Sequence, residues 1–137
     1  MKNPYPFLLV IAATLVAGGC ASHEGAYQPV NTTQFDHENR SNFVLMDKGA
    51  QRSVTCSGIQ QTTLADGRLQ VAANVRNRES RRIEVQINCE FKDEQGFVLE
   101  ATPWQTLILT ENAQETVSFS SMNNEARRYT FRIRQAR

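Results

Sequence analysis

The chain has 137 residues, which is enough for one domain with a single hydrophobic core. Its formal net charge is +1, and removal of Lys2 with an N-terminal signal would leave a neutral chain. A neutral chain has no overall field that attracts nucleic acid or anionic lipid, so we expect no nucleic-acid partner.

Residues 1–19 have the features of a secretory signal peptide. Lys2 precedes a continuous apolar run from Phe7 to Ala17. This run is much shorter than the roughly twenty residues that a membrane-spanning helix needs, and small residues follow it. The sequence Ala17-Gly18-Gly19-Cys20 resembles the lipobox of bacterial lipoproteins, although lipoboxes usually have Leu where Ala17 stands. We therefore predict cleavage before Cys20 and a lipid on its thiol; the alternative is ordinary secretion by the general signal peptidase.

Residues 20–51 are predicted to be the lipidated cysteine and a tether. The stretch 21–42 is polar without a sustained hydrophobic period, and such a composition cannot offset the entropy of ordering. The apolar patch 43–46 is either a short strand or a segment that docks on the domain. Ala21, and not Asp, follows the cysteine. By resemblance to the sorting rule of Gram-negative lipoproteins, this implies the outer membrane, with the domain in the periplasm.

Residues 52–137 are predicted to form the folded domain, because apolar and polar residues alternate there as in half-buried strands. The alternation is clearest at 69–76, 83–92 and 129–134, and weaker strands are expected at 54–63, 96–99, 104–109 and 116–120. Turns are expected at 65–67 and 93–96, and Pro103 should interrupt the strand ladder. About seven short strands without a long helix predict an all-β fold, a small immunoglobulin-like β-sandwich.

The stretch from Leu69 to the end resembles the YcfL-like family of bacterial periplasmic and outer-membrane lipoproteins. The shared elements are an Asn-containing turn, an aromatic-x-Asp-x-x-Gly turn, a following Trp and a terminal strand. In this chain they are Asn77, Phe91, Asp93, Gly96, Trp104 and residues 129–133. These motifs are structural and the function of that family is not established. The resemblance therefore implies a fold and an envelope location but no activity, and it does not imply a disulfide.

Cys56 and Cys89 are the cysteines that remain when Cys20 carries lipid, and the predicted compartment is oxidising. Cys89 has the inward parity of Ile87, and Cys56 has the parity of Val54. Two inward cysteines on different strands can bridge the layers of a sandwich, so we predict a disulfide between them. The alternative is two separate buried thiols that serve as small apolar core residues.

Four arginines and one tryptophan are candidate contacts for a partner. The arginines surround one strand connection: Arg76, Arg78, Arg81 and Arg82. A basic connection can bind carboxylates, phosphates or an acidic protein face, whereas the alternative is a soluble turn that discourages edge pairing. An exposed Trp104 would be an interface hot spot, but we expect it in the core, because a Trp between two sheets is common in sandwiches.

No catalytic, metal or cofactor site can be assembled from the sequence. His23 and His37 lie in the predicted tether, where neither imidazole is held against a partner. The chain contains no Gly-rich phosphate loop, no Gly-x-Ser-x-Gly and no CxxC motif. We therefore expect a protein that is not an enzyme and that needs no cofactor or metal.

The sequence thus predicts a lipid-anchored periplasmic β-sandwich that is a binding or accessory subunit of a cell-envelope protein assembly. Its membrane contact is the lipid on Cys20, and the protein partner stays open. The alternative is a small-molecule or glycan-binding module, for example for peptidoglycan, with Trp104 and the arginine connection as its site.

Overall fold

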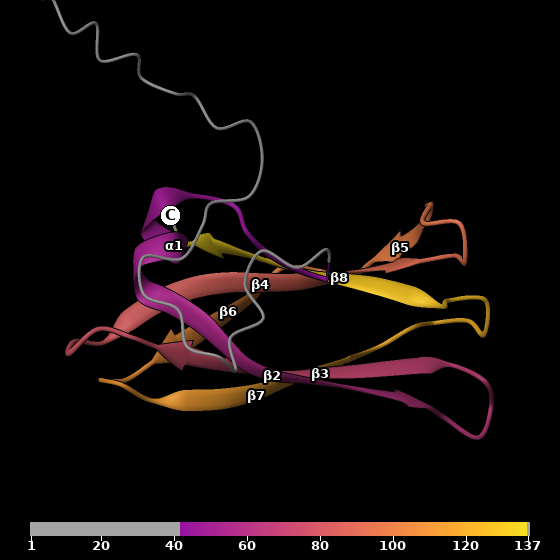
Figure 1. Ribbon diagram of the computed structural model, residues 1–137, viewed down its shortest axis with the longest axis horizontal. Helices are drawn as coiled ribbons and strands as arrows, with labels where there is room; N and C mark the ends of the chain where they lie inside the picture. Colours follow the sequence, from indigo (N-terminus) through magenta and orange to yellow (C-terminus); the bar gives the residue numbers. More distant parts are fainter. Residues whose placement is uncertain (1–41, 137) are drawn as a thin grey trace, which may run out of the picture.

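The computed structural model describes residues 42–136, which form eight strands in two packed sheets and one short helix (Figure 1). In chain order the elements are β1 (Phe43–Leu45), α1 (Lys48–Ser53), β2 (Val54–Thr63), β3 (Leu69–Asn77), β4 (Ile83–Lys92), β5 (Val98–Ala101), β6 (Gln105–Leu109), β7 (Gln114–Ser120) and β8 (Arg128–Gln135). The predicted β-sandwich is confirmed, and it has one strand more than the seven expected. The predicted signal peptide and Cys20 lie outside the described residues.

Sheet A, the upper layer in Figure 1, has β4 in its middle. β8 pairs antiparallel with one side of β4, and β1 pairs in parallel with the far side of β8. On its other side β4 pairs first with β6 and then with β5, both antiparallel. The residues at the two ends of the described chain, in β1 and β8, are therefore neighbours in the same sheet.

The folded domain begins before the predicted boundary at residue 52, because β1 and α1 belong to it. Phe43 lies beside Phe131 in the parallel pairing, and Leu45 lies beside Ile133. The side chains of all four residues are fully buried. The patch 43–46 therefore contains a strand, Phe43–Leu45, and residues 43–51 are not part of a tether. A strand of three residues is too short for its alternation to be recognised in the sequence.

Asp47 fixes the beginning of α1. One carboxylate oxygen accepts a hydrogen bond from the backbone N–H of Ala50 at 2.8 Å, as expected of an N-cap residue. The other oxygen accepts from the backbone N–H of Gln135 at 2.8 Å. Gly49 lies so close to Gln135 that a Cβ at this position would meet its side chain. The helix is thereby attached to the end of β8.

Pro103 interrupts the ladder between β5 and β6, as predicted. Thr102 holds the interrupted segment against β4: its N–H donates to the carbonyl of Cys89 at 2.9 Å, and its hydroxyl accepts from the N–H of Cys89 at 2.9 Å. The side-chain amide of Asn88 donates to the carbonyl of Thr102 at 3.2 Å. The chain can therefore stay on β4 across a proline that has no N–H to donate.

Sheet B, the lower layer in Figure 1, consists of β2, β3 and β7 in that order, all antiparallel. The register of β2 and β3 shifts between Cys56 and Gly58. The hairpin that joins them turns at Gly67, whose φ is 84°. A Cβ at this position would also lie 3.1 Å from the Cβ of Asn124 in the β7–β8 connection. Glycine therefore suits both the backbone angle and the close approach of the two connections.

The core lies between the inner faces of the sheets, and Phe131 of β8 is central to it. Its ring centroid lies 6.4 Å from that of Phe43, 6.0 Å from that of Phe119 and 5.7 Å from that of Tyr129. Phe119 comes from β7, so this aromatic cluster joins the two sheets. The other large apolar side chains that are fully buried are Leu45, Val54, Val71, Val75, Ile87, Phe91, Leu109 and Ile133.

Cys56 and Cys89 are both fully buried in this core, one in sheet B and the other in sheet A. The predicted disulfide is not formed in the structure, where both residues are thiols. The thiol of Cys56 donates to the carbonyl of Gly58 at 3.4 Å, and that of Cys89 donates to the carbonyl of Glu90 at 3.8 Å. Burial raises the pKa of Cys89 to about 12, so its thiol stays neutral.

Candidate functional site

The four arginines that the sequence singled out have different surroundings. Arg76 is exposed on the outer face of sheet B. Arg78 is half-buried, and its backbone N–H donates to the carbonyl of Ser53 at 2.9 Å. Arg81 and Arg82 are exposed in the connection between β3 and β4, where both line a depression of about 300 Å³ next to α1. The sequence-predicted basic cluster is therefore divided between a sheet face and a connection.

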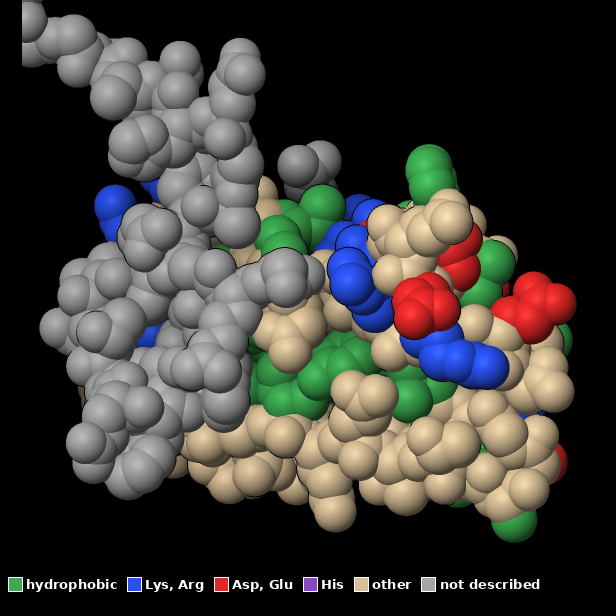
Figure 2. Space-filling model, turned by 45° about the vertical axis from the view of Figure 1, so that its right-hand side comes forward, with side chains coloured by type: hydrophobic (Ala, Val, Ile, Leu, Met, Phe, Trp, Pro, Cys, Tyr) green, Lys and Arg blue, Asp and Glu red, His purple; other side chains and the backbone are tan. Residues whose placement is uncertain are grey.

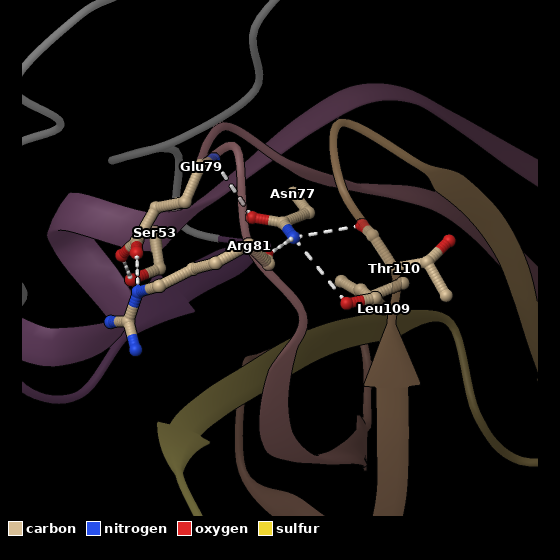
Figure 3. A network of polar contacts seen from close by, with 6 residues as sticks. All are labelled: Ser53, Asn77, Glu79, Arg81, Leu109 and Thr110. Carbon is tan, nitrogen blue, oxygen red and sulfur yellow. Dashed lines mark hydrogen bonds and ion pairs between the residues drawn. The ribbon is translucent and has the colours of Figure 1, made fainter.

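Asn77 joins two connections at the end of β3, and its side chain is fully buried (Figure 3). Its amide nitrogen donates to the carbonyls of Arg81 at 2.7 Å, Thr110 at 2.8 Å and Leu109 at 3.3 Å. Its amide oxygen accepts from the N–H of Glu79 at 2.8 Å. Each contact satisfies a backbone group of the β3–β4 or β6–β7 connection. The role of Asn77 is therefore to hold these two connections together.

Glu79 extends this network towards the surface. Its carboxylate accepts hydrogen bonds from the hydroxyl of Ser53 and from the guanidinium of Arg81 (Figure 3). The hydrogen bond from Ser53, followed by that from Arg81, lowers the pKa of Glu79. Since Ser53 ends α1, the carboxylate joins the helix to the β3–β4 connection. The charge of Arg81 is engaged in this contact, which weakens the case for the connection as a binding site.

Trp104 lies on the outer face of sheet A, half-buried, so the prediction that it belongs to the core is wrong. It has the parity of Thr106, which lies beside Gln86 on the outward side of β4. Its ring is covered by the guanidinium of Arg134, whose central carbon is 3.9 Å from the ring centroid. The guanidinium of Arg132 lies at 5.3 Å. Both distances are within the range of cation–π attraction.

Polar pairs between β4 and β8 hold the two arginines in place. Nε of Arg134 donates to the side-chain oxygen of Gln86 at 2.8 Å, and Nε of Arg132 donates to that of Asn88 at 3.0 Å. Glu90 lies 2.7 Å from a terminal nitrogen of Arg132. Each hydrogen bond joins directly opposite residues of the strand register, which fixes the orientation of both guanidinium groups.

We call this surface the Trp–Arg face, defined by six outward residues of sheet A and the segment before β6: Gln86, Asn88, Glu90, Trp104, Arg132 and Arg134. A guanidinium has five N–H donors, and the contacts described above use only some of them. Exposed Ile108 of β6 also has outward parity and adds apolar area beside it. The surface thus combines an aromatic ring, oriented cations and an aliphatic side chain.

Sequence reasoning missed Arg132 and Arg134 as candidate residues. Their alternation with Phe131 and Ile133 already predicts that they face outward. The missing signal was the pairing of β8 with β4, and of β4 with β6, which brings both arginines to Trp104 across the sheet. Long-range pairing of this kind is not visible in the local pattern of a single sequence.

Within residues 42–136, no group of three or more His, Cys, Asp and Glu side chains is arranged to hold a metal ion. The one helix in this range, α1, is neither long nor apolar enough to cross a bilayer. His23, His37 and the predicted lipid site Cys20 lie outside the described residues.

The fold and this surface define a small two-sheet β-sandwich with an aromatic–arginine face. The chain belongs to the family described as "Protein of unknown function (DUF1425)", whose family model matches residues 41–135.

Two solved structures resemble this fold. One is a DUF1425 family member from Shewanella sp. pv-4, which is 23% identical with a TM-score of 0.58; the match covers 74% of this chain and 95% of that one. The other is cj0090 of Campylobacter jejuni, which is 16% identical with a TM-score of 0.57; the match covers 71% of this chain and 100% of that one. No curated protein sequence matches this chain. At these identities the structural likeness shows the fold alone.

Proposed function

We propose that this protein is a lipid-anchored periplasmic β-sandwich of the outer membrane, similar to YcfL-like lipoproteins. It is a non-catalytic binding or accessory subunit of a cell-envelope protein assembly. The observation that carries this proposal is the Trp–Arg face, where Arg132 and Arg134 are fixed against Trp104. Trp and Arg are the side chains that most often dominate the binding energy of protein interfaces.

The arrangement of the face favours binding. The hydrogen bonds to Gln86 and Asn88 already fix Arg134 and Arg132, so a partner loses less side-chain entropy when it binds them. Remaining N–H donors of Arg134, whose hydrogen bond is to the neutral amide of Gln86, can bind carboxylates of a partner, while Trp104 and Ile108 supply apolar area. A protein surface that presents acidic and apolar side chains together is therefore the expected partner.

The same geometry favours a protein partner over a glycan. A sugar ring that binds a tryptophan stacks on the face of the indole, and Arg134 already covers Trp104 at 3.9 Å. A glycan would have to displace this guanidinium or use the other side of the ring. The glycan-binding module remains the second candidate because half-buried Gln86 carries an amide group on the same outer face of sheet A as Trp104.

Site-specific photo-crosslinking in cells tests the protein-binding proposal. A photoreactive residue replaces Thr106, which is exposed on the outer face of sheet A. In the matched control it replaces Ser118, which is exposed on the outer face of sheet B. We expect one discrete crosslinked protein from position 106 and none from position 118. Trp104→Ala and Arg134→Ala should each remove that crosslink without lowering the amount of folded protein. Equal crosslinking from both positions would contradict the proposal.

A second measurement separates the two candidate functions. Purified wild-type protein and its Trp104→Ala variant are incubated with purified peptidoglycan and sedimented. Under the proposal, neither protein co-sediments above the level of a non-binding control protein. Sedimentation of the wild-type protein that is lost in Trp104→Ala would instead support the glycan-binding module.

The anchor has its own test. The order of a basic residue, a short apolar run, small residues and then Cys20 supports lipidation at this cysteine. Mass spectrometry of the mature protein should find an acylated N-terminal Cys20, and outer membranes should contain it. Cys20→Ser should give precursor or soluble protein. An unmodified mature N-terminus would refute the anchor and leave the binding proposal standing.

A further inference from the structure

One end of the sandwich carries four large apolar side chains that are exposed. Phe97, Val98 and Leu99 lead from the β4–β5 hairpin into β5, and Met122 follows β7. Phe97 is 68% exposed and Met122 is 86% exposed. We call this surface the apolar end. Figure 2, in which the right-hand side of Figure 1 comes forward, shows hydrophobic side chains that protrude at the rim of the molecule.

The two segments that carry these side chains are held together by hydrogen bonds. The backbone N–H of Met122 donates to the carboxylate of Glu100 at 2.6 Å, directly after the apolar stretch. The N–H of Arg127 donates to the carbonyl of Lys92 at 2.9 Å, which joins the β7–β8 connection to the end of β4. The four side chains therefore belong to one fixed end of the domain.

The chain reaches the domain at this same end. The side-chain amide of Asn42 donates to the hydroxyl of Tyr129 at 3.1 Å. The backbone carbonyl of Asn42 accepts a hydrogen bond from the backbone N–H of Phe131 at 2.9 Å. Asn42 also shares a depression of about 340 Å³ with Lys92, Gly96 and Arg127. The segment that leads back to Cys20 thus starts beside the apolar end, and even fully extended it reaches at most about 75 Å.

Charged side chains of both signs surround the apolar end. Arg127 and Arg128 are exposed there, and so are Glu94 and Glu125. The carboxylate of Asp93, at the hairpin, accepts a hydrogen bond from the backbone N–H of Phe97 at 2.9 Å. A mixed ring of charges matches the paired phosphate and ammonium groups of a zwitterionic phospholipid better than a uniformly anionic surface.

We propose that the apolar end docks on the zwitterionic phospholipid surface to which Cys20 is anchored, with Phe97, Val98 and Met122 inserted through the head groups to the boundary of the acyl chains. This inference rests on the lipid anchor of the proposed function. A few apolar side chains bind a bilayer only weakly by themselves. Attachment through Cys20 turns their insertion into an intramolecular step with a high effective concentration. The strands then stand away from the membrane, and the Trp–Arg face points sideways to a partner.

Depth-dependent fluorescence quenching tests this docking. Trp104 is the only tryptophan of the chain, so a Trp104→Phe background permits one new tryptophan at a time. Full-length lipidated protein is reconstituted in phosphatidylcholine vesicles with and without brominated acyl chains. In this background, Phe97→Trp places the probe at the apolar end, and Ser118→Trp on the outer face of sheet B is the matched control.

We expect brominated lipid to quench Phe97→Trp by about twofold and to leave Ser118→Trp unchanged, because only an inserted side chain reaches the acyl region. Addition of Met122→Asp to the Phe97→Trp protein should reduce the quenching.

Flotation with the vesicles is measured on the same samples. If the protein floats but Phe97→Trp is not quenched, the docking is wrong and the anchor stands. A protein that does not float would refute the lipid anchor, on which this inference rests, and would leave the binding proposal for the Trp–Arg face standing. The fluorescence emission of Phe97→Trp could instead shift to the blue with rising protein concentration, independently of brominated lipid. This result would show that a second copy of the protein covers the apolar end, and it would overturn the proposal.

Discussion

The outward surfaces of the two sheets differ sharply although both are built on one core. The Trp–Arg face of sheet A carries guanidinium groups of β8 that contact amide and carboxylate groups of β4 and the indole of the segment before β6. The outer face of sheet B has mostly uncharged amide and hydroxyl side chains: Gln60, Thr62, Gln70, Asn74, Gln114, Thr116 and Ser118. On the side of the molecule that Figure 2 shows, charged side chains are visible mainly on the upper layer, and the lower layer has few of them.

The fold therefore does not determine the chemistry of its two outer surfaces. Both sheets follow the same alternation, which sends apolar side chains inward. The outward positions are free to vary without loss of the core. On sheet B they form short-range polar contacts, such as the hydrogen bond of 2.7 Å between Thr116 and Asn74. On sheet A the outward side chains of Arg132 and Arg134 are held in fixed orientations by their contacts with β4 and Trp104. Four experiments test whether the two surfaces differ in this way on a common core.

Removal of the aromatic ring that joins the sheets should affect both surfaces at once. Phe131→Ala deletes a fully buried ring that contacts Phe43 of sheet A and Phe119 of sheet B. We expect the free energy of unfolding to fall by about 3–5 kcal/mol in urea denaturation. The matched control is Phe97→Ala, an exposed ring, which should change it by less than about 0.5 kcal/mol. Equal losses in the two variants would contradict the position of Phe131 in the core.

The network of Asn77 should matter more than a polar residue on the outer face of sheet B. Asn77→Ala leaves the carbonyls of Arg81 and Thr110 without this partner in a buried place, and we expect a loss of about 2 kcal/mol in unfolding free energy. Asn74→Ala is the control, since it removes only the exposed contact to Thr116, and it should cost less than about 0.5 kcal/mol. A loss below 1 kcal/mol in Asn77→Ala would refute its joining role.

Alkaline pH should lower the free energy of unfolding, because a buried thiol of the shared core titrates only in the unfolded chain. The pKa of Cys89 is about 12 in the folded protein and 9.0 is its ordinary value. Above pH 9 the unfolded chain therefore loses this proton while the folded chain retains it, so stability falls as pH rises. Between pH 8 and pH 10 we expect the contribution of Cys89 to lower the unfolding free energy by about 1.4 kcal/mol. Burial also raises the pKa of Tyr129, which acts in the same direction.

The comparison that isolates this effect is the pH dependence of Cys89→Ala. This variant should be less stable at pH 8, but its unfolding free energy should decline less steeply towards pH 10 than that of the wild-type protein. Identical slopes would show that Cys89 does not titrate in this range in either state.

The contact between Arg134 and Trp104 should give a small but measurable coupling energy. A double-mutant cycle of Arg134→Ala and Trp104→Ala should yield about 0.5–1 kcal/mol, as expected of a cation–π pair at a partly exposed site. The control cycle pairs Arg76→Ala on sheet B with Trp104→Ala, and its coupling should be zero within error. A coupling for Arg134 no larger than that of Arg76 would refute the ordered arrangement of the Trp–Arg face.

The sequence predicted the strands well because each has a local signature. Alternation placed β3, β4 and β8, and Pro103 correctly marked the interruption between β5 and β6. β1 escaped recognition because three residues show too little alternation, and it owes its place to the parallel pairing with β8. The predictions that failed concern single side chains whose surroundings come from segments distant in the chain, most clearly Trp104. Its burial could not be judged without knowing that Pro103 separates it from β5 and that two arginines of β8 lie opposite.

The candidate site shows the same limit. Arg76, Arg78, Arg81 and Arg82 are close in sequence, so they drew attention as a cluster, yet the strand alternation and Glu79 distribute them over different surroundings. The pair that the fold does bring to Trp104 was counted only as polar positions of the last strand. Local density of charge therefore did not indicate the surface that we propose for binding, whose residues share a sheet face and are distant in sequence.

The parallel pairing of β1 with β8 also determines how the domain responds to mechanical force. If the proposed anchor holds the chain ahead of residue 42, any pull on the domain enters the fold through Phe43–Leu45. The hydrogen bonds between β1 and β8 run across the strand axes, so tension along β1 loads them together in shear rather than one at a time. Phe43 and Leu45 must also leave the core before β1 can slide. A lipoprotein pulled between its membrane and a bound partner would thus meet its resistance at the first three residues of the fold.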